Sequence, residues 1–372
     1  MPSTLIAPSR SAAQTELPTT SEVKAALPAN VWDRRLGRSA AHAALSLVLT
    51  LGTGVLAAVF IPLSWAWAPV WILYSVVAGT FACGVWVVAH ECGHRAFCNG
   101  TRLQDSVGFV LHSALLVPYF SWQRSHAIHH AKTNHLTEGE THVPKADGTP
   151  EGARARAAHA RLGPTNHGIV SMVARLLFGW PAYLIAGATG GSVRGRTNHF
   201  WPYRPFSDAL FPARWKPRIL ASAAGVLATV LVLTAWAVAA GSIWPVAVLY
   251  GGPYLVNNMW LVGYTWLQHT NQDIPHYDDD EWSFVRGAFC SVDRPYGRVI
   301  DLLHHRIGST HVAHHLDAKI PHYNAAQATE AIRIAFPDLY RYDPTPIPKA
   351  LWRISRDCHV VQRTDHGWKF TN

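Results

Sequence analysis

Two long segments without any acidic or basic side chain constrain the fold of this chain most strongly. Neither residues 39–90 nor residues 219–272 contain Asp, Glu, Lys or Arg, and each segment is longer than 50 residues. A helix that crosses a bilayer needs about 20 apolar residues, so each segment can hold two crossings joined by a tight turn. The pattern predicts an all-α membrane protein in which the four spans cover about 40–63, 68–90, 218–240 and 244–267.

Basic residues precede both predicted hairpins, and the turns of the hairpins carry none. The residues in question are Arg34, Arg35 and Arg38 before the first hairpin and Arg214, Lys216 and Arg218 before the second. By the positive-inside rule, both termini and the loop between the hairpins lie on the cytoplasmic face of the plasma membrane or endoplasmic reticulum. All histidine motifs described below then fall on that same face, so they can form one site.

Two further apolar segments test this topology, because a crossing by either would separate the motifs. The segment 107–120 is too short to span and contains His112 and Pro118. The segment 169–188 contains Arg175 and Pro181 and is interpreted as interfacial or re-entrant.

The predicted membrane domain covers residues 39–345 and lies between two tails. Residues 1–38 are expected to be a disordered cytoplasmic tail, because their first part is rich in Ser, Thr, Ala and Pro and shows no cleaved signal. Residues 346–372 are predicted to be a cytoplasmic C-terminal tail. The five cysteines form no C-x-x-C pair and are expected to be reduced. The net charge of +9 suits anionic lipids and an acidic redox partner; no nucleic-acid signature is visible, and the oligomeric state stays open.

Histidines cluster in three short motifs beside the predicted spans. Neutral imidazole is a common metal ligand, and residues three and four apart share one face of a helix. His269 ends the fourth span and is a ninth possible ligand, with His305 and then His304 as competitors for that place. The motifs contain His90 and His94; His126, His129 and His130; and His311, His314 and His315.

Eight or nine imidazoles exceed the four ligands of one tetrahedral zinc and therefore imply two metal ions. Imidazole suits Zn, Cu, Fe and Ni alike, so the ligand type does not choose among them. A dimetal site that faces an apolar pocket in the bilayer suits attack on a lipid. An unreactive C–H bond requires an oxidant that amino acids cannot supply, and metal-activated O2 is the agent that fits.

The chain resembles the membrane-bound fatty acid desaturases, and among them the Δ12 (oleate) acyl-lipid type, over about residues 86–329. The segments that carry the resemblance are HECGHRAF (90–97), HSALLVPYFSW (112–122), SHAIHH (125–130), ETHVPK (140–145), WLQHT (266–270), PHYD (275–278), VDRPYG (292–297), THVAHHL (310–316) and PHYNA (321–325). The resemblance implies a diiron centre held by the eight motif histidines, with a further histidine near the fourth span. It also implies that O2 and two electrons convert a lipid-linked acyl chain to one with a cis double bond. The electrons would come from a separate ferredoxin, or from cytochrome b5 with its reductase, since no fused HPGG signature is present.

The chain departs from the usual Δ12 pattern at residues 317–319 and 123–124, so its regiochemistry stays open. The alternatives are an ω3 desaturase and a hydroxylase, epoxygenase or acetylenase on the same scaffold. His90 to His94 also fit the H-E-x-x-H pattern of a zinc protease, in which Glu91 would be the general base. Glu91 is instead interpreted as a residue that orients an imidazole. A metal transporter is disfavoured, because such proteins place ionisable groups within the spans.

Overall fold

The computed structural model describes residues 17–371 and confirms the all-α fold class, with one small β-hairpin. The α-helices are α1 (Thr20–Ala25), α2 (Leu36–Phe60), α3 (Ala68–Gly93), α4 (Thr101–Ala114), α5 (Tyr119–Ala131), α6 (Pro150–Ala186), α7 (Lys216–Ala239), α8 (Trp244–Val246), α9 (Gly252–His269), α10 (Phe284–Ala288), α11 (Arg298–Leu303), α12 (His311–Leu316), α13 (His322–Ala335) and α14 (Ile347–Asp357). The strands β1 (Val361–Thr364) and β2 (Gly367–Phe370) pair antiparallel. Short 3-10 helices cover Ala29–Trp32, Trp65–Trp67, Ser192–Arg194 and Ala213–Trp215, and a π-helical turn covers Ala247–Gly251.

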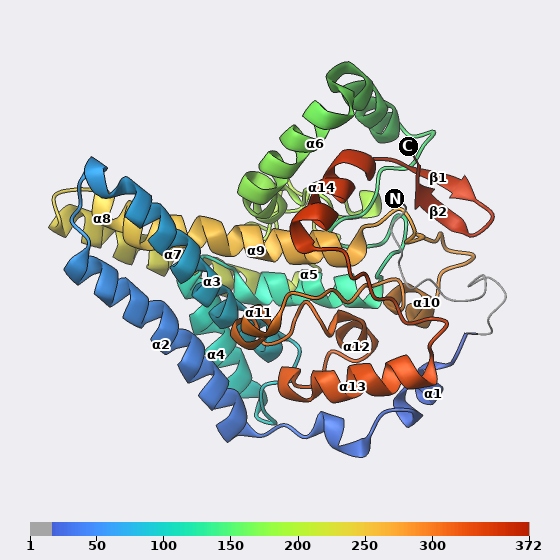
Figure 1. Ribbon diagram of the computed structural model, residues 1–372, viewed down its shortest axis with the longest axis horizontal. Coiled ribbons are helices and arrows are strands. Elements are labelled where there is room, and N and C mark those ends of the chain that lie inside the picture. The colour runs from blue at the N-terminus through green and yellow to red at the C-terminus, as the bar shows by residue number, and fades with distance from the viewer. Residues whose placement is uncertain (1–16, 372) are drawn as a thin grey trace.

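Two helical hairpins, α2–α3 and α7 to α9, reach the same end of the molecule, at the left of Figure 1. Their turns touch, because the rings of Trp65 and Trp244 lie 5.7 Å apart. Gly79 of α3 lets α9 approach closely: a Cβ atom at this position would lie 2.5 Å from the Cβ of Val256. The hairpins therefore pack as one bundle around α3.

The ends of these helices follow from local sequence. Helix α3 has Pro69 and α7 has Pro217 in the first turn, where the missing N–H of proline costs nothing. Helix α7 is followed by Gly241, whose φ of 62° lies in the left-handed region that glycine adopts readily and that terminates helices. The N–H groups of Gly241 and Ser242 donate to the carbonyls of Val238 and Ala237 and complete the last turn.

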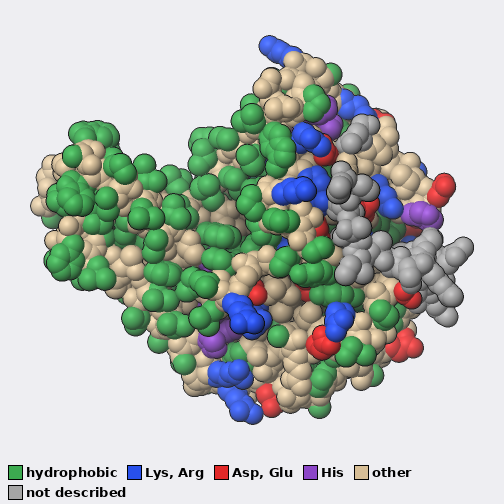
Figure 2. Space-filling view, viewed as in Figure 1, with side chains coloured by type: hydrophobic (Ala, Val, Ile, Leu, Met, Phe, Trp, Pro, Cys, Tyr) green, Lys and Arg blue, Asp and Glu red, His purple; other side chains and the backbone are tan. Residues whose placement is uncertain are grey.

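The bundle exposes apolar side chains to its surroundings, as the left part of Figure 2 shows. Exposed residues of α2 include Val48, Leu51 and Val59, and those of α7 include Val232 and Val238. Such a broad exposed apolar surface is unfavourable in water and suits contact with lipid tails.

Four helical segments in the described part of the chain are long and apolar enough to cross a membrane: Leu36–Phe60, Trp65–Gly93, Pro150–Ala186 and Ala213–Ala239. Three of them coincide with the first three predicted spans. The predicted span 244–267 is instead divided by the π-helical turn, and its main part, α9, contains the buried polar residues Asn257 and Asn258. Helix α6 replaces it among the four, although the sequence analysis interpreted its apolar end as interfacial. In Figure 1, α6 lies beside α14, far from the turns of the two hairpins.

The N-terminal segment differs from the expected disordered tail. Residues 1–16 lie outside the described part of the chain, but residues 17–38 form α1, a 3-10 helix and the start of α2. Val23, Leu27 and Val31 recur every four residues and are buried against α12 and α13. Trp32 Nε1 also donates to Asp317 Oδ2 at 3.1 Å. The prediction of disorder was wrong for residues 17–38, because their overall polar composition does not reveal the short apolar stripe of Val23, Leu27 and Val31.

The C-terminal residues 346–372, predicted as a tail, form α14 and the β-hairpin through residue 371. A buried ion pair between Arg294 and Asp343 fixes the chain that leads to α14, and Arg353 of α14 contacts the same carboxylate at 2.7 Å. Helix α14 packs against α6 and α9. The cap of the bundle therefore includes both ends of the described chain.

Candidate metal centre

Three helix ends and one short helix bring the predicted histidines together at the base of the bundle. His90 lies in the last turn of α3, and His94 follows that helix directly. Helix α5 carries His126, His129 and His130 on its last turns, and the short helix α12 carries the third motif. His269 is the last residue of α9. All nine predicted ligands thus meet at one place.

We call the larger cluster the first group; its ligand atoms all lie within 4.8 Å of one another, and it contains His90, His94, His126, His130 and His314. The Nε2 atom of His126 lies 3.0 Å from that of His90 and 3.2 Å from that of His130. The Nε2 atoms of His90 and His94 are also 3.2 Å apart. Ring nitrogens from α3, α5 and α12 therefore converge on a common point.

The second group contains His129, His269 and His315, again with ligand atoms within 4.8 Å. The Nε2 atoms of His129 and His269 are 3.1 Å apart, and His311 brings its Nε2 atom to 3.0 Å from that of His269. Every ring of this group is buried. The groups are adjacent, because the rings of His126 and His129 stack with centroids 5.3 Å apart.

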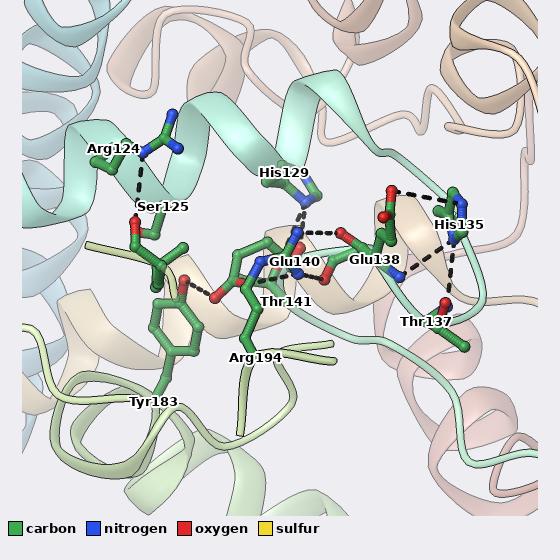
Figure 3. A network of polar contacts seen from close by, with 12 residues as sticks. Arg124, Ser125, His129, His135, Thr137, Glu138, Glu140, Thr141, Tyr183 and Arg194 are labelled. Carbon is green, nitrogen blue, oxygen red and sulfur yellow. Dashed lines mark hydrogen bonds and ion pairs between the residues drawn. The ribbon is translucent and has the colours of Figure 1, made fainter. Parts of the chain in front are cut away.

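Hydrogen bonds fix two rings of the second group. Figure 3 shows His129 above the loop that contains Glu140 and Thr141. Its Nδ1 atom donates to the carbonyl oxygen of Glu140 at 2.7 Å, which leaves Nε2 free to bind a metal. The hydroxyl of Thr133 donates to the carbonyl of His129 and accepts from Nδ1 of His315 at 2.9 Å.

Burial keeps these imidazoles in the neutral form that binds metal. It lowers the pKa of His129 to about 4 and that of His314 to about 3, because the charged ring loses its hydration. The pKa of His130 also falls well below its usual range, first through burial and then through neighbouring histidines. The cluster therefore presents unprotonated nitrogens at neutral pH.

The nitrogen positions fit two transition-metal ions. Two imidazoles bound at about 2.1 Å and separated by about 90–110° at the metal place their nitrogens about 3.0–3.4 Å apart. The observed separations of 3.0–3.2 Å fall in this range. Nε2 of His314 and Nε2 of His315 are moreover buried without a hydrogen-bond partner. Buried polar atoms of this kind need a partner, and a metal ion supplies one.

Glu91 does not face either group as a protease base would. Its Oε2 atom accepts a hydrogen bond from the backbone N–H of His322 at 2.9 Å and lies 3.4 Å from Nδ1 of the His322 ring. It contacts an imidazole, as the sequence analysis expected, but that imidazole belongs to none of the three motifs. His304 is also turned away: its ring contacts the hydroxyl of Tyr264 and the carbonyl of Thr80.

Several positioning residues escaped the sequence analysis. Asp293, within the VDRPYG segment, accepts the backbone N–H of Val312 at 2.8 Å and so holds the first turn of α12 beside His311. Thr133 and Glu140 act in a similar way on His315 and His129. Two of the segments used for the resemblance contain Asp293 and Glu140, but the distances along the chain gave no indication of their partners.

A narrow apolar cavity of about 60 Å³ reaches the first group at His126. Trp86, Trp122, Leu261 and Val262 line it, and α6 contributes Gly179. His142 and Thr265 form a polar contact of 2.9 Å between their side chains at its edge. An apolar chain that enters this cavity would pass beside the metal centre.

The family model described as fatty acid desaturase matches residues 65–346, more than half of the chain. The chain belongs to the fatty acid desaturase family. This desaturase is 39% identical to the Delta(12)-acyl-lipid-desaturase of Punica granatum over 352 residues, which cover 93% of this chain and 87% of the relative. It is 40% identical to the Delta(12) fatty acid desaturase of Mortierella alpina over 366 residues, which cover 94% of this chain and 89% of that relative. It is also 38% identical to the oleoyl-12-hydroxylase of Ricinus communis over 349 residues, which cover 92% of this chain and 87% of that relative.

Proposed function

We propose that this desaturase introduces a cis Δ12 double bond into oleoyl chains of membrane lipids. The proposal rests on one observation above all: the cavity between α3, α5, α6 and α9 is lined by His126, a member of the group that offers five converging imidazoles. Relatives named as Δ12 desaturases, which match over most of this chain, support the position of the new bond.

Nine histidines would hold two iron ions, one in each group, with His311 completing the second. When bound, the two irons with O2 supply the oxidising power that a C–H bond of an unactivated methylene requires. Thr133 and the Glu140 carbonyl fix the rings of His315 and His129, so the ligand nitrogens are in place before any metal binds.

The cavity walls would position the acyl chain. Trp86 and Trp122 pack edge to face with centroids 5.4 Å apart and form a rigid wall next to His90 and His126. Leu261 and Val262 of α9 form part of the same lining. These apolar side chains exclude water around the methylene groups that lie nearest to His126 and restrict how far the chain slides.

The membrane topology that we propose places both termini and the metal centre on the cytoplasmic face. The α2–α3 hairpin and the α7–α9 hairpin each return the chain to the side from which it came. A single crossing by α6 would place the second and third motifs on opposite sides, yet His130 and His314 lie in one group. Helix α6 is therefore best treated as a helix at the membrane surface.

Electrons would come from a separate acidic protein, a ferredoxin or cytochrome b5 with its reductase. The net charge of +9 favours such a partner. In Figure 2, Lys and Arg side chains lie mostly on the part of the surface away from the apolar bundle. A small acidic donor could approach this part without entering the membrane.

Hydroxylation at the same carbon is the second candidate function. The oleoyl-12-hydroxylase of Ricinus communis is nearly as similar to this chain as the desaturases are. Overall identity therefore does not separate the two products.

The test is a fatty acid profile of cells that express the wild type or His129→Ala, with double bonds located by mass spectrometry. New 18:2 Δ9,12 only with the wild type is the expected result. A 12-hydroxy product would favour the second candidate, and a double bond at another position would contradict Δ12 selectivity. An unchanged profile, despite membrane insertion and a competent electron donor, would overturn the proposed activity.

A further inference from the structure

A third group of histidines, His42, His305 and His322, lies outside the two groups assigned to iron. The ligand atoms of its three rings again lie within 4.8 Å of one another. They come from distant parts of the chain: His42 from α2, His305 from the turn after α11, and His322 from the first position of α13. Ring centroids are 4.6 Å apart for His42–His322, 4.6 Å for His305–His322 and 5.4 Å for His42–His305.

Two of these rings are held so that one nitrogen stays available. Nδ1 of His322 lies 3.4 Å from Oε2 of the buried Glu91, and its Nε2 atom is buried without a partner. Nε2 of His305 contacts the hydroxyl of Ser46 at 3.0 Å, and its Nδ1 atom lacks a well-formed hydrogen bond. A carboxylate behind a histidine is the usual arrangement that orients a metal-binding imidazole.

The ring spacing of the third group is similar to that of the first group. Centroid separations of 4.5–4.9 Å within the set His90, His94 and His126 compare with 4.6–5.4 Å here. The backbone of His305 adopts φ of 54° and that of Arg306 φ of 61°, a conformation that ordinary residues rarely adopt. The turn thus brings His305 to His42 and His322 at the expense of backbone strain.

We propose that His42, His305 and His322 bind a third metal ion, a divalent transition metal such as Zn²⁺, independently of the two irons. Three imidazoles leave one coordination position for water, a common arrangement for zinc. The Glu91 carboxyl, 3.4 Å from Nδ1 of His322, would orient that ring from the side away from the ion. The bound ion would hold α2, the turn after α11, and α13 together beside the first histidine motif.

Zinc binding to the full-length protein tests this site. The purified protein is treated with a chelator, re-equilibrated with ZnCl2 alone, freed of excess ion and assayed for zinc per chain by mass spectrometry. His42→Phe keeps an aromatic ring of similar size at a half-buried position but removes one ligand. We expect His42→Phe to bind about one zinc fewer per chain than the wild type, and zinc to raise its Tm less.

His366→Ala is the matched control, because His366 lies on the exposed turn between β1 and β2 and outside all histidine groups of the described chain. It should bind as much zinc as the wild type. Co²⁺ loading gives a second measurement: the wild-type visible spectrum minus that of His42→Phe should show absorption from one nitrogen-coordinated cobalt. Equal zinc and equal cobalt spectra in folded wild type and His42→Phe would overturn the site. Desaturation is measured separately in cells, so its absence would not alter this comparison.

Discussion

The first and second histidine groups lie side by side, yet their surroundings differ. In the second group every ring is buried, and Thr133 and the Glu140 carbonyl fix two of the three rings. In the first group His94 and His126 are only half-buried, and His126 borders the apolar cavity. The second group is therefore rigid and the first is accessible from the cavity, so substitutions around them should have different effects.

Removing His269 should have the largest effect. His269→Ala deletes a ligand of the second group that lies outside the three sequence motifs, and its buried site offers no replacement. We expect product formation to fall more than about 100-fold, beyond the loss usual for a residue that only supports a ligand. The measurement is product per unit of membrane-inserted protein, with His366→Ala as control. Activity within about twofold of the wild type would remove His269 from the ligand set.

Narrowing the cavity should affect access to the first group without changing its metal. A Cβ atom on Gly179 would lie 3.6 Å from both methyl carbons of Val262, so Gly179→Ala fits and Gly179→Val crowds the cavity. We expect Gly179→Val to lower turnover of oleoyl chains by roughly 10- to 100-fold at unchanged iron content, because a displacement of about 1 Å can cost about 100-fold. Gly179→Ala should retain most activity. Equal turnover by both variants would show that the acyl chain takes another route.

Loosening a ring in the second group should weaken metal binding. Thr133→Val preserves shape but loses the acceptor for Nδ1 of His315, so we expect about 10-fold weaker iron binding. Thr133→Ser restores the hydroxyl and should restore the affinity. Competition with a chelator of known affinity measures the change. If the Thr133→Val variant bound iron as tightly as the wild type does, the rigidity assigned to the second group would be wrong.

The loop behind His129 should make stability depend on pH. Burial raises the pKa of the Glu140 carboxyl to about 7, so the folded protein retains a proton that the unfolded chain releases above about pH 4.3. The free energy of unfolding therefore falls as the pH rises from about 4.3 towards 7. Gln at position 140 does not ionise, so Glu140→Gln abolishes this pH-dependent loss. We expect the free energy of unfolding of Glu140→Gln to exceed that of the wild type by on the order of 1–3 kcal/mol between pH 5 and 8. The measurement is the Tm in detergent as a function of pH, with Glu138→Gln, a change at a more exposed carboxylate, as control. Tm profiles of Glu140→Gln and the wild type that ran parallel across this pH range would contradict the prediction.

Much of the fold and the centre follows from local pattern. Charge-free segments predict the two hairpins, and helical spacing predicts that His126, His129 and His130 lie near one another on a helix. His269 was predictable because it lies near the end of the second charge-free segment. The N-terminal segment was misjudged, since the partners of Val23 and Val31 lie about 300 residues further along the chain. Thr133, Asp293 and the Glu91–His322 contact depend on such long-range packing and leave no local periodicity.

We propose that each of the two groups holds one iron. Iron per chain, measured by mass spectrometry in purified wild type, His126→Ala and His269→Ala, tests this assignment. We expect each substitution to remove about one iron and leave the other, because each changes a different group. Unchanged iron in both variants would contradict the assignment of these histidines to a diiron centre.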